Sequence, residues 1–214
     1  MVLPNLSTLS LSVGAPAPTG AGVGGEDYDG KVTEYGSFKG KEREVRVELP
    51  DGQVMHLKGA KGEERKVRIE DLRDRVTYFK GAKGKERKVR IEGPLGRVTH
   101  FEGAKGKERK VRDELLDGYH VEYFEGAKGE ERKVRYENDN GKIVEYFEGV
   151  KGEERKVRAE MYNGFFVDYY EGVKGEERKV RTEWRNGMVN YFEGVKGDER
   201  TVRTEFPSGR VLYH

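Results

Sequence analysis

The sequence predicts an all-β protein: an elongated, single-layer antiparallel β-meander built from about eight β-hairpin repeats of 22–23 residues. Three observations lead to this prediction. A phrase recurs along the chain, side-chain character alternates within each phrase, and Gly-containing turns separate the alternating segments. No amphipathic helical period accompanies them, so the sequence offers no second layer to cover the sheet.

The recurring phrase is anchored on an Arg that follows Glu, as in YFEGVKGEERKVRAE. Steps of 22 or 23 residues separate the copies, and a Val stands two positions after the Arg in each one. The anchoring residues are Arg43, Arg65, Arg87, Arg109, Arg132, Arg155, Arg178 and Arg200. The repeat array therefore spans residues 28–214.

Residues 1–27 differ in composition, because their first 25 positions lack charge and are rich in Ser, Gly, Pro and Ala. A signal peptide would place basic residues before an apolar run, and this segment has none. We interpret it as a disordered leader or linker. No run in the chain approaches the ~20 apolar residues that span a bilayer, and the compartment stays unknown.

Segments such as ERKVRAE and FVDYYE alternate in character and contain β-branched and aromatic residues, which is typical of strands. The expected tight turns contain Gly after Asp, Asn or Ser, residues that tolerate a positive φ. They are Asp51-Gly52, Asp117-Gly118, Asn140-Gly141, Asn163-Gly164, Asn186-Gly187 and Ser208-Gly209. With a strand on each side of every turn, the sequence predicts roughly seventeen antiparallel strands.

The pairing register follows from matching side chains across the turns. We expect Arg158 opposite Tyr169, Phe147 opposite Val157 and Glu148 opposite Lys156. One face would then carry Val and aromatic residues, and the other Arg–Tyr and Lys–Glu rows. A parallel β-solenoid is the alternative, but it would stack like charges on neighbouring rungs, which is destabilising.

The composition excludes several function classes. Lys and Arg total 42 against 40 Asp and Glu, and this near-neutrality argues against nucleic acid as a partner. The chain has no Cys, so disulfides and thiolate metal sites are excluded. With 34% hydrophobic and 38% charged residues, a thick core is not expected.

The sequence contains no recognisable catalytic set. His56 and His100 occupy the column that Tyr fills in other repeats, and we expect them to stack beside Arg as those Tyr residues do. His120 and His214 stand alone near strand ends, and no His or carboxylate cluster accompanies them. The Gly-Ala-Lys-Gly and Gly-Val-Lys-Gly stretches lack the spacing of a phosphate-binding loop and predict hairpin turns. Paired turn carboxylates such as Glu153-Glu154 are expected to be solvated. We therefore predict a non-enzyme with no catalytic, cofactor-binding or metal-binding residues and no cofactor.

The phrase Tyr-Phe-Glu-Gly, the Asn-Gly or Asp-Gly turn some five residues before it, and the period together resemble MORN-repeat proteins. The phrase is most similar to 22–23-residue repeats in long algal proteins. This resemblance implies paired strands in one long sheet. The stretch GAKGEERKVR departs from the usual MORN pattern and weakens any lipid-binding role that the resemblance suggests.

One column of apolar and aromatic residues on the Val-aromatic face is the candidate partner-binding stripe, because exposed apolar patches mark interaction sites. Its residues are Leu57, Phe79, Phe101, Phe124, Phe147, Tyr170 and Phe192. Flanking residues become more acidic toward the C-terminus, so the N-terminal half should bind more readily.

These features favour a non-catalytic structural or scaffold module that presents a long regular surface for protein–protein interaction. The expected partner is a protein, or a second copy that associates through the edge strands. The alternative is binding of a polyanion or phospholipid headgroup through the repeated Arg and Lys rows. A membrane surface is thus left open as a partner without being favoured.

Overall fold

The structure, a computed structural model, describes residues 31–35, 43–115, 118–138 and 140–214. The leader or linker expected over residues 1–27 lies outside the described residues. Among the described residues, all but three of those in regular elements belong to β-strands, and the exception is a short 3₁₀ helix, η1 (Pro94–Gly96).

Within the described ranges the strands number seventeen, as the sequence predicts, and they form one sheet. They are β1 (Lys31–Tyr35), β2 (Arg43–Glu48), β3 (Val54–Gly59), β4 (Arg65–Glu70), β5 (Val76–Lys80), β6 (Arg87–Glu92), β7 (Val98–Glu102), β8 (Arg109–Leu115), β9 (His120–Glu125), β10 (Arg132–Asn138), β11 (Ile143–Glu148), β12 (Arg155–Met161), β13 (Phe166–Glu171), β14 (Arg178–Trp184), β15 (Val189–Glu193), β16 (Arg200–Glu205) and β17 (Val211–Tyr213).

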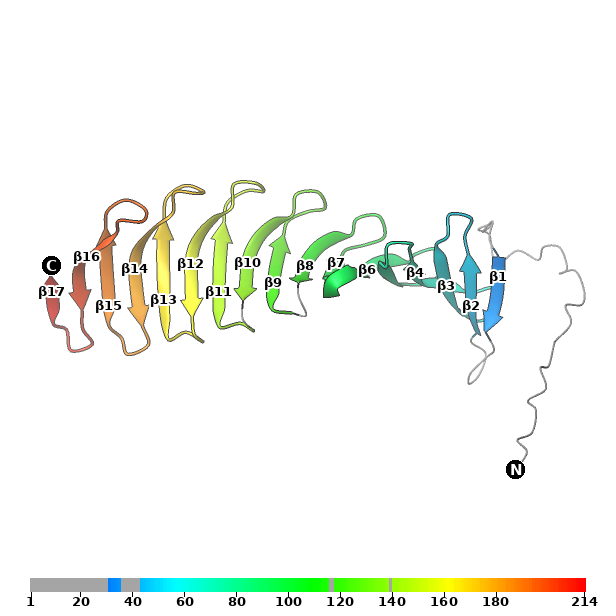
Figure 1. Cartoon of the computed structure of the whole chain (residues 1–214), viewed down its shortest axis with the longest axis horizontal. Coiled ribbons are helices and arrows are strands. Elements are labelled where there is room, and N and C mark those ends of the chain that lie inside the picture. The colour runs from blue at the N-terminus through cyan, green and yellow to red at the C-terminus, as the bar shows by residue number, and fades with distance from the viewer. Residues whose placement is uncertain (1–30, 36–42, 116–117, 139) are drawn as a thin grey trace, which may run out of the picture.

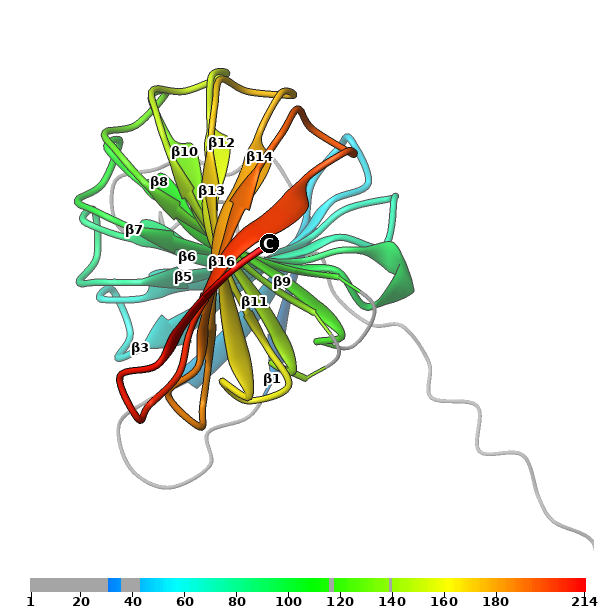
Figure 2. The ribbon, with the colours of Figure 1, turned by 90° about the vertical axis from the view of Figure 1, so that its left-hand side faces the viewer.

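Each strand pairs antiparallel with the next one along the chain, from β1–β2 to β16–β17. The predicted meander is therefore confirmed, and the parallel solenoid is excluded. The strands stand side by side in a long row (Figure 1). Seen along that row, they fan out around a central axis (Figure 2), because each strand is rotated relative to its neighbour, as strands in twisted sheets are.

The predicted tight turns are confirmed where the structure describes them. At Asn163 and Gly164 the φ angles are +60° and +75°, a left-handed pair that Asn and Gly adopt at low cost. These turns form one rim of the sheet. The opposite rim consists of the Gly-Ala/Val-Lys-Gly loops, which we call lysine loops, at residues 59–64, 81–86, 103–108, 126–131, 149–154, 172–177 and 194–199.

The predicted register is correct beside the tight turns, and in the hairpins closed by lysine loops it is correct only as far as the Arg–Tyr pair, where Tyr146 lies opposite Arg158 as expected. Arg158 lies opposite Tyr169 as expected. Phe147, however, lies opposite Lys156 and not opposite Val157, and Glu148 lies opposite Arg155. Val157 is the extra residue of a β-bulge, which shifts the register by one position between Tyr146 and Phe147.

The same shift occurs in each hairpin that a lysine loop closes. The bulge changes which side chains share a face, because a shift of one residue turns the following side chains to the other side. The Val-aromatic ladder is therefore replaced by a ladder of aromatic residues and lysines. The predicted Lys–Glu row is replaced by pairs such as Arg155–Glu148, whose charged atoms lie 3.6 Å apart.

Two faces result, and we name each by its residues. The arginine–tyrosine face carries Arg68, Tyr78, Arg90, His100, Arg112, Tyr123, Arg135, Tyr146, Arg158, Tyr169, Arg181, Tyr191 and Arg203. The lysine–aromatic face carries Leu57, Lys66, Phe79, Lys88, Phe101, Lys110, Phe124, Lys133, Phe147, Lys156, Tyr170, Lys179 and Phe192.

A small apolar cluster lies near the N-terminal end of the sheet. Val45, Val47, Met55 and Leu57 are each no more than 2% exposed, and Leu49 and Ile69 pack against them. Elsewhere most strand residues are half-buried, as a single layer requires. The chain therefore relies mainly on contacts between neighbouring strands.

Candidate functional site

The candidate stripe lies on the lysine–aromatic face, and the structure places a lysine ammonium over each of its aromatic rings. The distances from Nζ to the ring centroid run from 3.6 Å for Lys110 and Phe124 to 4.5 Å for Lys66 and Phe79. The other four pairs are Lys88–Phe101, Lys133–Phe147, Lys156–Tyr170 and Lys179–Phe192. Such cation–π contacts contribute ~0.5–1 kcal/mol each at exposed sites.

The stripe is therefore not a bare apolar patch. Leu57 is buried in the N-terminal cluster, and the six rings are half-buried beneath lysine side chains. Each lysine comes from the strand that precedes its ring along the chain. The contact between neighbouring strands thus joins one repeat to the next.

Neighbours of these lysines change along the chain. In the middle of the sheet the lysines meet carboxylates: Lys133 lies 3.5 Å from Glu122, and Lys156 lies 3.2 Å from Glu145. Around Lys66 and Lys88 the same face carries Ile69 opposite Thr77 and Ile91 opposite Thr99. The apolar character expected of the N-terminal half is thus present in the neighbours of its rings.

Two aspartates of the lysine–aromatic face are buried and hydrogen-bonded. The Arg97 guanidinium donates to Asp113 at 2.6 Å, and the Thr99 hydroxyl donates to the same carboxylate. Asp168 accepts a hydrogen bond from the Thr182 hydroxyl at 2.5 Å. Burial and the nearby Asp168 charge raise the pKa of Tyr170 far above its usual range. These carboxylates therefore stabilise strand pairs.

The arginine–tyrosine face carries a repeated arrangement of three side chains. An Arg forms an ion pair with the Glu two residues later in its own strand, as Arg158 does with Glu160 at 2.9 Å. The same Glu accepts a hydrogen bond from a Tyr of the preceding strand, such as Tyr146 at 3.0 Å. The Arg158 guanidinium also lies 5.0 Å from the centroid of the Tyr146 ring, within the range of a cation–π contact.

Histidines replace Tyr in two repeats, as the sequence predicts. His100 Nε2 lies 2.7 Å from Glu114, in the position of a Tyr hydroxyl. Burial and Arg68 lower the pKa of His56, which stands between Arg46 and Arg68. Each Arg carries its own carboxylate partner on this face, so the basic row is largely neutralised.

The lysine loops contain a contact that the sequence analysis missed. The carboxylate of Glu177 accepts a hydrogen bond from the Gly175 backbone in its own loop at 3.0 Å. Its other oxygen accepts from the backbone amide of Lys156, in the preceding repeat, at 3.3 Å. Lys174 donates in turn to the Gly152 carbonyl of the preceding loop at 2.6 Å.

We call this pair of contacts the clasp, and it recurs along the sheet. The lysine contacts are Lys83–Gly62, Lys105–Gly84, Lys128–Gly106, Lys151–Gly129, Lys174–Gly152 and Lys196–Gly175. The glutamate contacts to a preceding amide include Glu86–Lys66, Glu108–Lys88, Glu131–Lys110, Glu177–Lys156 and Glu199–Lys179. The signal for the clasp in the sequence is the strict recurrence of Lys at the third position and of Glu at the last position of each loop.

The clasp corrects the expectation that the turn carboxylates are solvated. Glu153 is exposed as expected, but Glu154 is half-buried and Glu64 is only 3% exposed. Backbone amides of Glu199 and Lys179 lower the pKa of the Glu199 carboxyl below its usual range. The Glu at the last position of each loop is thus part of the fold.

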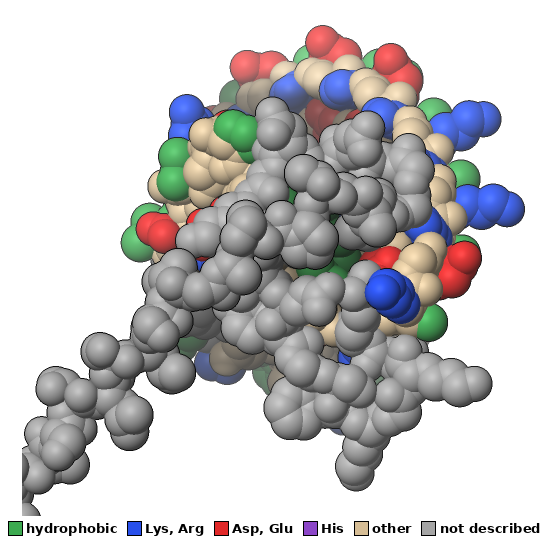
Figure 3. All heavy atoms as spheres, turned by 90° about the vertical axis from the view of Figure 1, so that its right-hand side faces the viewer, with side chains coloured by type: hydrophobic (Ala, Val, Ile, Leu, Met, Phe, Trp, Pro, Cys, Tyr) green, Lys and Arg blue, Asp and Glu red, His purple; other side chains and the backbone are tan. Residues whose placement is uncertain are grey.

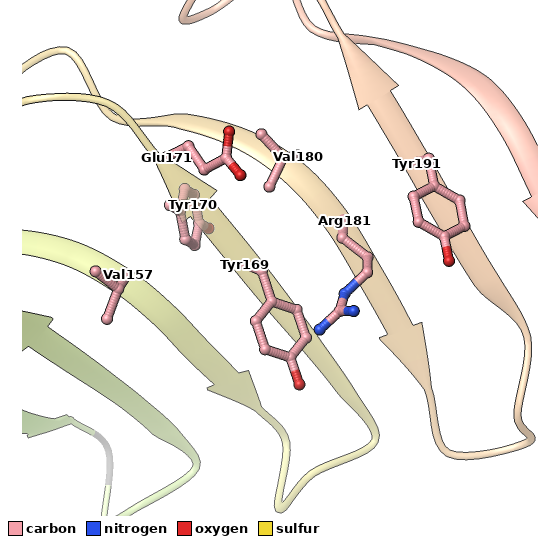
Figure 4. A pocket seen from close by; sticks show the side chains of 7 residues that line it. All are labelled: Val157, Tyr169, Tyr170, Glu171, Val180, Arg181 and Tyr191. Carbon is pink, nitrogen blue, oxygen red and sulfur yellow. The ribbon is translucent and has the colours of Figure 1, made fainter.

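Surface depressions between the strands are shallow. One, of about 460 Å³, is lined by residues of β12 to β15 (Figure 4). In it the Arg181 guanidinium points to the Tyr169 ring and lies 4.0 Å from its centroid, while Tyr191 stands on the next strand. Seen from its N-terminal end, the molecule shows basic, acidic and hydrophobic side chains mixed along the visible rim (Figure 3).

Within the described ranges, no three His, Asp or Glu side chains are arranged to hold a metal ion. No helix in the described part of the chain is long and apolar enough to cross a membrane.

The fold and the two faces define a class: a regular repeat of antiparallel β-hairpins in one open sheet. No protein-family model matches the chain, and no curated protein matches its sequence.

Proposed function

We propose that this chain is a non-catalytic scaffold whose lysine–aromatic face binds a protein partner. The observation that carries the proposal is the row of six rings, each beneath a lysine, repeated at the spacing of the hairpins. A row of this kind offers apolar ring surface and positive charge at regular intervals along a long sheet. Its relation to MORN repeats, suggested by the Tyr-Phe-Glu-Gly phrase and supported by the hairpin plan, is part of the same proposal.

The N-terminal half of this face is the preferred contact. There Ile69 and Ile91 lie opposite Thr77 and Thr99, on the face that carries Phe79 and Phe101, whereas Asp113 and Glu122 occupy the equivalent pair of places one repeat further along. A partner segment that carries both apolar and acidic side chains fits this surface: its apolar groups would cover the isoleucines, and its carboxylates would approach Lys66 and Lys88.

The alternative, a polyanion or phospholipid headgroup on the basic rows, is less well supported. The arginines of the arginine–tyrosine face already pair with glutamates of their own strands, as in Arg90–Glu92 and Arg181–Glu183. A polyanion would have to displace these carboxylates. Retention on heparin that falls steeply with salt would favour this alternative, because phosphate or sulfate contacts release counterions.

The test of the protein-scaffold proposal is affinity capture from the source cell, followed by mass spectrometry. A Phe79→Ser/Phe101→Ser variant is compared with Tyr170→Ser/Phe192→Ser, which changes the same repeat positions in the acidic half. Circular dichroism must first show that both variants are folded. We expect the first variant to lose partners that the wild type and the second variant retain. If the folded first variant retains every partner, the stripe is only structural and the proposal fails.

A further inference from the structure

Three of the tight turns contain the pair Asn-Gly: Asn140-Gly141, Asn163-Gly164 and Asn186-Gly187. The asparagine is exposed in each turn. In such a pair the Gly amide nitrogen can attack the carbonyl carbon of the Asn side chain, because Gly has no side chain to hinder ring closure. Since the reacting pair is the same in all three turns, its reactivity should depend on what each turn does with the two groups.

The turn at Asn186 holds both reacting groups. The Asn186 side-chain oxygen accepts a hydrogen bond from the Met188 amide at 3.0 Å, and the Gly187 amide donates to the Trp184 carbonyl at 2.8 Å. Before the ring can close, the side chain has to leave its donor and the amide has to leave its acceptor. This turn therefore protects its Asn.

The turn at Asn163 leaves both groups free. The Met161 carbonyl, which stands where Trp184 stands one repeat later, accepts from the Phe165 amide at 3.0 Å and not from the Gly164 amide. Within the described ranges no other acceptor reaches the Gly164 amide, and no hydrogen bond is made by the Asn163 side chain. That side chain can rotate toward the Gly164 nitrogen without breaking a bond.

The turn at Asn140 is intermediate. The Gly141 amide donates to the Asn138 carbonyl at 3.1 Å, so the nucleophile is held, but no described residue hydrogen-bonds to the Asn140 side chain. Exposure alone would give a different order, because Gly187 is exposed whereas Gly141 and Gly164 are half-buried. The hydrogen bonds and the exposure thus make opposite predictions for these turns.

We propose that Asn163 is a site of spontaneous deamidation that reacts faster than the other two Asn-Gly pairs. The Gly164 nitrogen attacks the carbonyl carbon of the Asn163 side chain and forms a cyclic imide. The bond from that carbon to the side-chain nitrogen breaks, and the NH2 group leaves with the amide proton as ammonia. Water then opens the imide at one of its two carbonyls, which leaves an aspartate or an isoaspartate at position 163.

The isoaspartate product should disturb the neighbouring turns as well. In this product the main chain runs through the former side chain and contains one more carbon atom. The Tyr162 amide donates to the Lys142 carbonyl of the preceding turn at 2.6 Å, and the Phe165 carbonyl accepts from the Arg185 amide of the next turn at 2.9 Å. Lengthening the chain between Tyr162 and Phe165 should weaken both contacts. The site lies on the rim that the tight turns form, so it goes beyond the proposed function of the stripe.

The first test follows deamidation of the folded 214-residue chain at mildly alkaline pH. Peptide mass spectrometry assigns the amide-to-carboxyl mass change to each asparagine. We expect Asn163 to react at least about tenfold faster than Asn186, because each hydrogen bond that has to break first slows the reaction about fivefold. Asn140 should lie between them. If Asn140 or Asn186 reacts as fast as Asn163 in the folded chain, the proposal is overturned.

The same measurement in concentrated urea separates the effect of the fold from that of the flanking residues. The three rates should converge there, because the hydrogen bonds of the turns are lost. An equal spread of rates in urea would assign the order to the flanking residues and would overturn the structural explanation.

The second test measures the consequence for the turn. Ion exchange isolates the acidic fraction of aged protein, and its urea unfolding is compared with that of Asn163→Asp, which has a normal backbone. We expect Asn163→Asp to be nearly as stable as the wild type, since Asp also tolerates a positive φ, and part of the acidic fraction to unfold at lower urea. Asn163→Gln, whose longer side chain closes a ring far less readily, should form little acidic fraction. Equal accumulation in Asn163→Gln, or an acidic fraction as stable as Asn163→Asp, contradicts the proposal.

Discussion

The Glu177 carboxylate lies 3.3 Å from the backbone amide of Lys156, twenty-one positions earlier in the sequence and one repeat away. With the Gly175 amide as its second donor, this carboxylate joins two successive hairpins at the lysine-loop rim. The phrase GEERKVR recurs because each loop both holds the preceding repeat and is held by the following one.

Removing this carboxylate should destabilise the protein. Glu177→Ala leaves the amides of Lys156 and Gly175 without their acceptor, and hydrogen bonds to charged groups contribute about 1.5–3 kcal/mol. We expect a loss of about 1–2 kcal/mol in the free energy of unfolding, measured by urea denaturation. Glu176→Ala, at the exposed neighbouring position, is the control and should change it by less than about 0.5 kcal/mol. Equal effects of the two variants would contradict the role of the clasp.

The clasp also predicts sensitivity to acid. The pKa values of Glu108, Glu131, Glu154, Glu177 and Glu199 lie below the ordinary Glu value of 4.5, because backbone amide donors outweigh burial where burial opposes them. A carboxyl with a lower pKa in the folded state stabilises that state above the unfolded-state pKa. This contribution should be complete near neutral pH and disappear as the pH falls from about 4.5 through the lower folded-state values.

Urea denaturation at pH 7, 5, 4 and 3 measures this effect. A variant with Gln at positions 131, 154 and 177 should be less stable than the wild type at pH 7, and it should lose less stability on acidification. If the wild type is as stable at pH 3 as at pH 7, the carboxylates contribute nothing to folding.

The two glycines of each lysine loop should respond differently to substitution. A Cβ added at Gly172 would lie 2.5 Å from the Glu176 carbonyl oxygen, closer than such atoms approach. A Cβ at Gly175 meets nothing within 4 Å, although its φ of +84° is unfavourable for Ala. We expect Gly175→Ala to cost about 1 kcal/mol and Gly172→Ala at least about 2 kcal/mol, measured by thermal unfolding. An equal cost would mean that the loop relaxes around the added methyl group.

The strands and tight turns could be predicted from the sequence because their signals are local. The alternation of side-chain character in ERKVRAE predicts a strand, and the Asn163-Gly164 pair predicts a tight turn. Each of these signals depends on only a few adjacent residues. The pairing of Arg158 with Tyr169 was also predictable, because the short turn between them leaves little choice of register.

The bulge at Val157 could not be predicted in the same way. A regular Lys-Val-Arg alternation is compatible with a straight strand, and the shift appears only when Phe147 is placed opposite Lys156. Lys110 and Asp113 illustrate its effect. They are three residues apart in one strand, a spacing that places side chains on opposite faces of a regular strand, yet their charged atoms lie 3.8 Å apart because Val111 is the extra residue.

The final prediction concerns the array as a whole. Apart from η1 and β8, the principal contacts between elements of the described chain join strands that are consecutive in sequence. Stability should therefore grow with the number of repeats, as in other one-dimensional arrays. Deletion of residues 131–153 joins Glu130 to Glu154, which then occupies the place of Glu131 in the lysine loop.

The clasp and the bulge are thus rebuilt at the new junction, and we expect a folded protein with a lower free energy of unfolding. A deletion of residues 131–142, which removes one strand and its turn, is the control, because it joins two halves of unlike hairpins. Circular dichroism and urea denaturation compare the two. An unfolded chain after the 23-residue deletion would show that distant parts of the sheet support one another, in conflict with the consecutive contacts of the strands.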